Sequence, residues 1–147
     1  MFVGRSEELG LLEKMYAKKS LSLVLVSGGY KIGKTAFLQE FLQKKAAAYF
    51  VARNALSTVN LAAFCLELKE QGLWGTKNEF RSWDSVLSAL FFRATQQQLV
   101  LVVDDVQYLF DSAPEFFAAF DKYATKYKKQ LRLLVVLAGA PWAEMER

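Results

Sequence analysis

The residues best suited to chemistry lie in Gly28–Thr35, which reads GGYKIGKT and matches the pattern G-x-x-x-x-G-K-[ST]. Glycines let the backbone bend until several N–H groups point at one centre, and the start of a following helix adds unpaired donors and partial positive charge. In such a loop Lys34 would reach the β- and γ-phosphates of a nucleotide, and the Thr35 hydroxyl would bind Mg²⁺. The bare pattern also occurs as an ordinary turn, so its context decides. The predicted nucleotide-binding residues of this stretch are Gly28, Gly29, Tyr30, Lys31, Ile32, Gly33, Lys34, Thr35 and Ala36.

A second candidate site follows the apolar segment Leu99–Val103, which runs directly into Asp104 and Asp105. Several apolar residues followed by an acid form the Walker B pattern. The first carboxylate of such a pair holds Mg²⁺, and the second orients or deprotonates the attacking water. Alone this string is weak, because a strand that ends in two aspartates is also a common start of a loop. Paired with the phosphate loop, it predicts Asp104 as a metal ligand and Asp105 as a catalytic residue.

The segments around both motifs predict the elements that would position them. Leu21–Val26 is a short apolar run typical of a strand buried on both faces, and Lys34–Ala46 has apolar residues at the spacing of one helix face. Further apolar runs predict strands at 48–52, 99–103 and 133–138. Strands that alternate with amphipathic helices indicate an α/β fold with a parallel sheet covered on both faces. Ligands bind beyond the carboxyl ends of such strands, where the phosphate loop, Asp104 and Gly139 are expected.

Helix start signals precede several of the apolar patterns. Ser6 is the expected N-cap of a helix that runs to about Lys18, and Asn60 is the expected N-cap of a helix that ends near Gly72. The stretch 72–78 is rich in turn-forming residues and is expected to be a surface connection.

Two more helices are expected in the second half of the chain. Ser82 is the expected cap of a helix in which Trp83 and the apolar residues after it fit the helical template at every offset. Ser112–Glu115 has the spacing of a capping box with a proline in the first turn, which predicts a helix that carries several aromatic residues.

The composition excludes several classes of protein. The chain has 147 residues, no histidine and one cysteine, Cys65, so imidazole acid–base chemistry, disulfides and thiolate-rich zinc sites are excluded. Hydrophobic residues make up 53% and charged residues 23%, which predicts one globular domain over residues 1–147. No apolar run reaches the roughly 20 residues of a membrane span, so we expect a cytoplasmic protein without a membrane partner. The net charge of +4 leaves nucleic acid as a weakly supported partner.

Four motifs, in their order and spacing, resemble those of the archaeal-type ATPases of the P-loop class, which are related to the AAA+ and STAND groups. Residues 2–9, FVGRSEEL, are similar to an N-terminal family motif that lies near the adenine. The phosphate loop is the second motif, and Phe80–Trp83 resembles a family phenylalanine-x-x-tryptophan that precedes the helix ahead of Walker B. Residues 101–109, LVVDDVQYL, resemble the family's Walker B segment. The resemblance spans the whole chain.

The resemblance implies a three-layer P-loop NTPase fold of the ASCE (RecA-like) type, with at least four parallel strands and with ATP and Mg²⁺ as cofactors. It also implies nucleotide contacts from Gly4 and Arg5. Three departures bear on activity: Ser6 stands where the family has an acid, Asp105 where it has the longer glutamate, and Ala140 where it commonly has a serine. Because two of these sites discriminate ATP from ADP, we expect the chain to bind nucleotide better than it hydrolyses it.

The same resemblance implies that an element is missing. Family members continue into a fifth strand, a lid and often a further C-terminal region, whereas this sequence stops at Arg147. The fifth strand would pair with strand 21–26, which would therefore become an edge, and a flat apolar edge invites aggregation unless it is covered. We therefore expect that residues 1–147 are the N-terminal fragment of a longer protein, or that self-association covers the edge.

Two functions follow from these observations. The first is Mg-ATP binding with slow hydrolysis by a motor or switch module, with Lys34, Asp105 and Gln107 as the catalytic residues. Hydrolysis is expected to be slow because no arginine has the context of a γ-phosphate finger, which is worth roughly 10³–10⁵ in rate. The second function is that of a non-hydrolysing regulator or adaptor that senses nucleotide occupancy. A small-molecule kinase is less favoured, since no lid with clustered arginines is visible, and GTP is disfavoured by the lack of an asparagine–lysine–x–aspartate string.

Overall fold

One sheet of four parallel strands forms the centre of the protein. The computed structural model describes residues 5–27, 31–73 and 80–139, and of residues 5–7, 27 and 31–34 it describes the backbone alone. The strands lie in the order β1-β4-β3-β2, and all three pairings are parallel. They span Ser22–Ser27 (β1), Ala47–Val51 (β2), Leu99–Asp104 (β3) and Leu133–Gly139 (β4). The α/β class and the four strands predicted from the apolar runs are confirmed, with boundaries shifted by about one residue.

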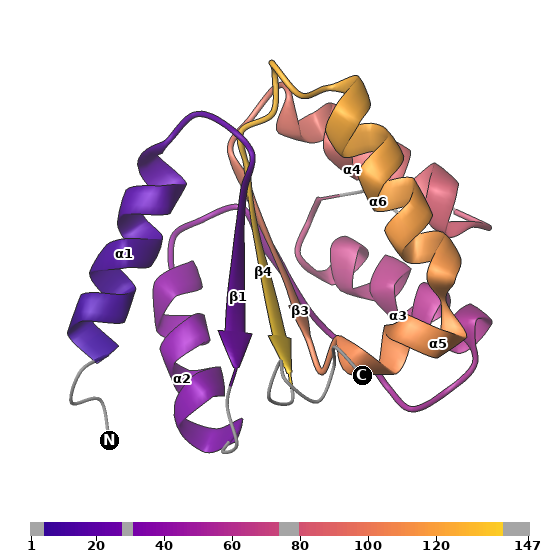
Figure 1. Ribbon diagram of the computed structural model, residues 1–147, viewed down its shortest axis with the longest axis horizontal. Coiled ribbons are helices and arrows are strands. Elements are labelled where there is room, and N and C mark those ends of the chain that lie inside the picture. Colours follow the sequence, from indigo (N-terminus) through magenta and orange to yellow (C-terminus); the bar gives the residue numbers. More distant parts are fainter. Residues whose placement is uncertain (1–4, 28–30, 74–79, 140–147) are drawn as a thin grey trace.

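Helices cover both faces of the sheet and give the three layers visible in Figure 1. On one face lie α1 (Arg5–Ala17) and α2 (Lys31–Leu42). On the other face lie α3 (Ser57–Glu70), α4 (Trp83–Ala94), α5 (Gln107–Ser112) and α6 (Pro114–Lys126). The predictions included no helix at 107–112; the short α5 follows directly after the two aspartates that end β3.

Each central strand contributes alternate side chains to two separate cores. In β3 all six residues are buried, with Leu101 and Val103 in the core beneath α3–α6 and Val100 and Val102 in the core beneath α1 and α2. Because successive side chains of a strand point to opposite faces, a strand buried on both faces must be apolar throughout. The same alternation places Tyr49 of β2 on the α2 face.

The predicted cap of α4 is confirmed. The Ser82 hydroxyl accepts a hydrogen bond from the backbone N–H of Ser85 at 3.0 Å, and the Ser85 hydroxyl accepts one from the backbone N–H of Ser82 at 3.3 Å, which completes a capping box. The apolar residues predicted for one face of this helix are all buried: Trp83, Val86, Leu87, Leu90, Phe91 and Ala94.

Two predicted helix starts on the N-terminal side are wrong. α1 begins at Arg5, so Ser6 lies inside the helix rather than before it. α3 begins at Ser57, and Asn60 lies inside its first turn, fully buried. The Asn60 amide instead accepts a hydrogen bond from the Arg53 N–H at 2.9 Å and donates one to the Arg53 carbonyl at 3.0 Å. A buried amide that closes the β2–α3 connection in this way cannot also cap a helix.

The predicted capping box at Ser112–Glu115 is also wrong, although Pro114 does occupy the first turn of α6. Ser112 is the last residue of α5, and its hydroxyl donates to the carbonyl of Tyr108 at 2.5 Å. Ala113 is the N-cap of α6 and provides no side-chain bond. The Glu115 carboxylate accepts a hydrogen bond from the Ser57 hydroxyl, which joins α6 to the start of α3.

The helix after the phosphate loop is shorter and earlier than predicted. α2 begins at Lys31 and ends at Leu42, whereas the pattern predicted residues 34–46. Lys44 ends the helical path with a φ of 65°, and the N–H of Lys45 donates to the Leu42 carbonyl at 3.1 Å. At the end of α3, Gly72 has a φ of 73°, as expected for a residue just beyond a helix. The rest of the predicted surface connection, residues 74–79, lies outside the described ranges.

Strand β1 is an edge, as predicted. Within the described ranges it pairs with β4 and with no other strand. Its side chains Val24 and Val26 pack against the α1–α2 core, but Leu23 and Leu25, on the opposite face, are 49% and 54% exposed. None of the described helices is both long enough and apolar enough to cross a bilayer.

Candidate functional site

The start of α2 and the end of β3 meet on the α2 side of the sheet. Thr35, in the second turn of α2, is half-buried, whereas Asp104 closes β3 and is only 3% exposed. Parallel strands bring their carboxyl ends to one edge, so the helix that follows β1 begins at the same edge of the sheet at which β3 ends, with β4 between the two strands. This is the convergence that the two sequence motifs require.

A third residue, Tyr49 of β2, joins the two predicted metal ligands. Its hydroxyl donates a hydrogen bond to Asp104 Oδ2 at 2.6 Å, and the Thr35 side chain lies close enough to the phenol to lower its pKa. One hydroxyl group therefore lies near both a predicted loop ligand and the predicted Walker B ligand. Thr35 and Asp104 are separated by 69 positions in the sequence yet lie within reach of the same oxygen.

Sequence reasoning missed Tyr49. The residue lies in a strand that is otherwise apolar, AAYFV, where a tyrosine is an ordinary core residue. The sequence did hold one signal, the alternation of side chains along the strand. Tyr49 shares a face of β2 with Ala47, and this face lies toward the helix that follows the phosphate loop. A polar tip on that face, next to a strand that ends in an acid, was a candidate for contact with the acid.

The pKa of Tyr49 lies well above its usual value of 10.0. Burial of the ring is the largest cause, and the hydrogen bond to the Asp104 carboxylate is the second. Both effects favour the protonated phenol, because ionisation would place a negative charge in a dehydrated site beside another one. Tyr49 is therefore a hydrogen-bond donor throughout the physiological pH range.

Asp104 and Asp105 differ in their hydrogen bonds and in their backbone conformation. Asp104 Oδ1 accepts a hydrogen bond from the Asp105 N–H at 2.8 Å, so both Asp104 oxygens have protein donors. Asp105 has a φ of 54°, in the left-handed region, and is 6% exposed. The next N–H, that of Val106, donates to the Ala138 carbonyl at 3.0 Å and ties this sharp turn to β4. Gln107, the first residue of α5, follows at once and is partly buried.

The oxygen atoms at this edge fit a magnesium ion better than a transition metal. Mg²⁺ is usually held by one or two protein oxygen ligands together with substrate phosphates and water, rather than by a complete protein cage. Thr35 and Asp104 supply a hydroxyl and a carboxylate that converge on one point. Within the part of the chain that the structure describes, no group of three or more carboxylate, thiol or imidazole side chains could hold a metal ion.

Other predicted nucleotide contacts are described in part or not at all. Lys31, Ile32, Gly33 and Lys34 lie in the first turn of α2, and Arg5 opens α1, all with backbone alone. Ala36 follows Thr35 in α2 and is exposed. Gly4, Gly28, Gly29, Tyr30 and Ala140 lie outside the described residues.

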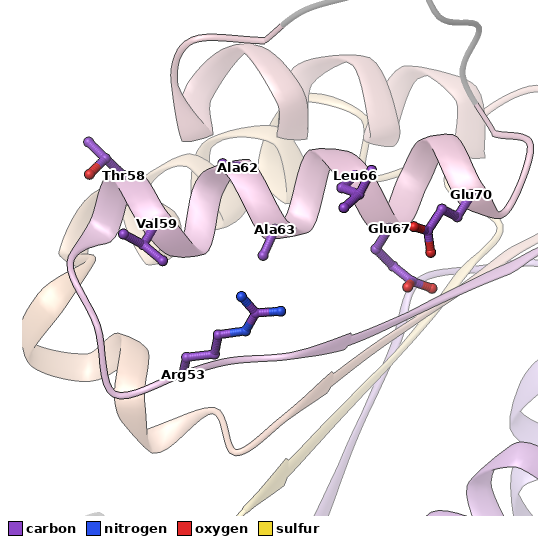
Figure 2. Close-up of a pocket in the computed structure, with 8 residues that line it drawn as sticks. All are labelled: Arg53, Thr58, Val59, Ala62, Ala63, Leu66, Glu67 and Glu70. Carbon is purple, nitrogen blue, oxygen red and sulfur yellow. The ribbon is translucent and has the colours of Figure 1, made fainter.

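A cavity with a volume of about 630 Å³ lies away from this edge. It lies between α3 and the outer flank of β2, and Figure 2 shows its lining, with the Arg53 guanidinium directed at α3. All the other lining residues belong to α3, with Thr58 near one end of the cavity, Glu67 and Glu70 near the other, and the apolar Val59, Ala62, Ala63 and Leu66 between them.

One protein of known sequence matches part of the chain. Over 45 residues the chain is 38% identical to a protein of Methanocaldococcus jannaschii named "Uncharacterized ATP-binding protein MJ0423", and the match covers 31% of this chain and 76% of that protein. No protein-family model matches the chain.

Solved structures share the fold. The Walker-type ATPase PABY2304 of Pyrococcus abyssi superposes with a TM-score of 0.64 and 19% identity, over 92% of this chain and 45% of that one. Cdc6p from Pyrobaculum aerophilum gives a TM-score of 0.63 and 18% identity, over 95% and 39% of the two chains. Drosophila ORC bound to DNA superposes with a TM-score of 0.64 and 19% identity, over 98% of this chain and 39% of that one. This chain spans less than half the length of each of these structures.

Proposed function

Because the chain belongs to the archaeal-type P-loop ATPases, we propose that it binds Mg-ATP where the start of α2 meets the end of β3. The observation that carries this proposal is the Tyr49 hydroxyl, which donates a hydrogen bond to Asp104 at 2.6 Å and lies close to the Thr35 side chain. The two oxygen groups that the sequence assigns to the metal therefore share one small volume. That volume lies beside the first turn of α2, whose N–H groups and partial positive charge favour phosphate.

Each side chain has a distinct proposed role. The loop 28–33 and Lys34 bind the phosphates, while Thr35 and Asp104 hold the cation. Bound Mg²⁺ would neutralise charge on the β- and γ-phosphates. Asp105 is buried beside Asp104 and orients or deprotonates the attacking water, with Gln107 as a polar neighbour at the start of α5. We propose slow hydrolysis, because Arg53 is directed at α3 and the short α5 brings no arginine to the site.

Binding is tested by thermal unfolding with and without millimolar Mg-ATP. Ligand present at about 100 times its dissociation constant should stabilise the folded protein by about 2.7 kcal/mol. Lys34→Ala should fold normally, since alanine suits a helical first turn, and should lose most of this stabilisation. A melting curve that Mg-ATP does not move, or moves equally in Lys34→Ala, would contradict the proposal.

Hydrolysis is distinguished from nucleotide sensing by steady-state phosphate release. The suitable variant is Asp105→Asn, because asparagine tolerates the left-handed backbone at this position and removes only the charge. If Asp105 is the general base, release should fall by roughly 10²-fold while ATP still binds. Equal release from both proteins would favour the second candidate, a regulatory or adaptor module that binds ATP without turning it over. The shorter side chain of Asp105 is the observation that favours this alternative.

We further propose that residues 1–147 are the nucleotide-binding domain of a longer cytoplasmic protein. The coverage of less than half of each solved neighbour supports this view, as does the edge strand β1. Nucleic acid is a weaker candidate partner, supported by the net charge of +4 and by the DNA in the Drosophila ORC structure.

A further inference from the structure

We propose that Tyr49 is a positioning residue of the Mg²⁺ site, whose hydroxyl donates to Asp104 at 2.6 Å and holds this carboxylate in the orientation that the cation needs. This inference rests on the proposed function and adds a residue that neither sequence motif contains. Groups that hydrogen-bond to metal ligands typically change metal affinity 10–100-fold when they are removed.

Both the backbone and the ring of Tyr49 are held in place. The backbone of Tyr49 is in register with Val102 of β3. Its N–H, on the outer side of the edge strand β2, donates to Glu67 Oε2 of α3 at 3.2 Å. The ring packs at the border of the core formed with α2. A strand residue anchored in this way delivers its hydroxyl to a defined point, as a positioning group must.

The hydroxyl fixes the carboxylate. Asp104 Oδ1 accepts a hydrogen bond from the Asp105 N–H at 2.8 Å and Oδ2 accepts one from Tyr49, so the carboxylate plane has a donor at each oxygen. A carboxylate oxygen can accept a hydrogen bond and still bind a metal ion or its water. Removal of the Tyr49 hydroxyl takes away the donor at Oδ2 of a carboxylate that is only 3% exposed, and a carboxylate that is held less firmly binds the ion less well.

The test compares ATP dissociation constants in Mg²⁺ and in excess chelator for the wild type and Tyr49→Phe. Phenylalanine keeps the ring and removes one oxygen, so the fold should persist. ATP affinity in chelator should stay the same, because the phosphate loop is unchanged, while the gain conferred by Mg²⁺ should shrink by about 10-fold. Tyr49→Met, which also removes the hydroxyl and fills irregular space, serves if the phenylalanine variant folds poorly.

Tyr123→Phe is the matched control. The Tyr123 hydroxyl also donates to a carboxylate, Asp84 Oδ2 at 2.9 Å, but on the α4–α6 side of the sheet. This variant should leave the Mg²⁺ gain unchanged, which separates a local effect on the metal from a general loss of stability.

The outcomes are distinguishable. If the wild type does not bind ATP in either condition, the proposed function itself fails. If the wild type binds and Tyr49→Phe keeps the full Mg²⁺ gain, the role of Tyr49 is refuted while the proposed function stands. A larger Mg²⁺ gain in Tyr49→Phe would also refute it, because the hydroxyl would then compete with the cation. A loss of affinity in chelator equal to the loss in Mg²⁺ would show a structural role alone.

Discussion

At the scale of single residues, the backbone of Asp105 sets a constraint that the sequence does not show. Its φ of 54° lies in the left-handed region, which costs an L-residue with a Cβ about 1–2 kcal/mol relative to glycine. Aspartate and asparagine meet this cost in part through local hydrogen bonds of the short polar side chain. The turn lets the Val106 N–H, two residues after Asp104, donate to the Ala138 carbonyl of β4 at 3.0 Å.

We predict that Asp105→Ala is less stable than Asp105→Gly by about 1 kcal/mol. Both variants remove the carboxylate, so the difference isolates the backbone conformation. Urea unfolding at matched pH, without nucleotide, measures it. Equal free energies of unfolding would show that the turn relaxes when the side chain is lost, and that the left-handed conformation is not imposed by the β3–β4 connection.

Tyr49 shows where residue-level prediction stops. Thr35 and Asp104 could be proposed as metal ligands from sequence because each belongs to a motif with fixed spacing around it. Tyr49 belongs to no motif, and its partner Asp104 lies 55 residues away. Contacts between residues so far apart in the sequence depend on the order of the strands, here β2 beside β3, and local periodicity does not predict strand order.

At the scale of elements, apolar periodicity predicted helices and strands well, but helix caps less well. The buried face of α4 and all four strands were predicted because burial acts on every residue of an element. A cap depends on one side chain, and that side chain is often needed elsewhere. Asn60 closes the β2–α3 connection, and Ser112 bonds within α5, so neither caps the helix that its sequence position suggested.

We predict that Ser82→Ala lowers the free energy of unfolding by about 1 kcal/mol, because it removes the side-chain acceptor for the Ser85 N–H at the start of α4. Ser112→Ala, at the site of the incorrectly predicted cap, should cost less than about 0.5 kcal/mol, since α6 begins without it. Chemical denaturation of the two single variants gives the comparison. A cost for Ser112→Ala as large as that of Ser82→Ala would mean that Ser112 supports the start of α6 after all.

At the scale of the whole molecule, β1 carries the phosphate loop and is also the exposed edge of the sheet. The helices α3–α6 cover β2, β3 and β4 on their face but leave Leu23 and Leu25 about half exposed. An edge with unpaired backbone and apolar side chains pairs readily with other chains. The strand that leads into the proposed nucleotide site is thus also an edge that needs a cover, from another part of a longer protein or from a second copy.

We predict that the 147-residue chain associates as its concentration rises and that Leu25→Lys reduces this association without loss of stability. Leu25 is 54% exposed, so a lysine can place its ammonium in water, and charge on an edge strand opposes pairing with another chain. Leu56→Lys is the control, because Leu56 is 74% exposed but precedes α3, away from β1. Light scattering across a range of concentrations measures the mass. If Leu56→Lys reduces association as much as Leu25→Lys, general hydrophobicity and not the β1 edge is responsible, and a wild-type chain that stays monomeric at every concentration would show that the edge needs no cover.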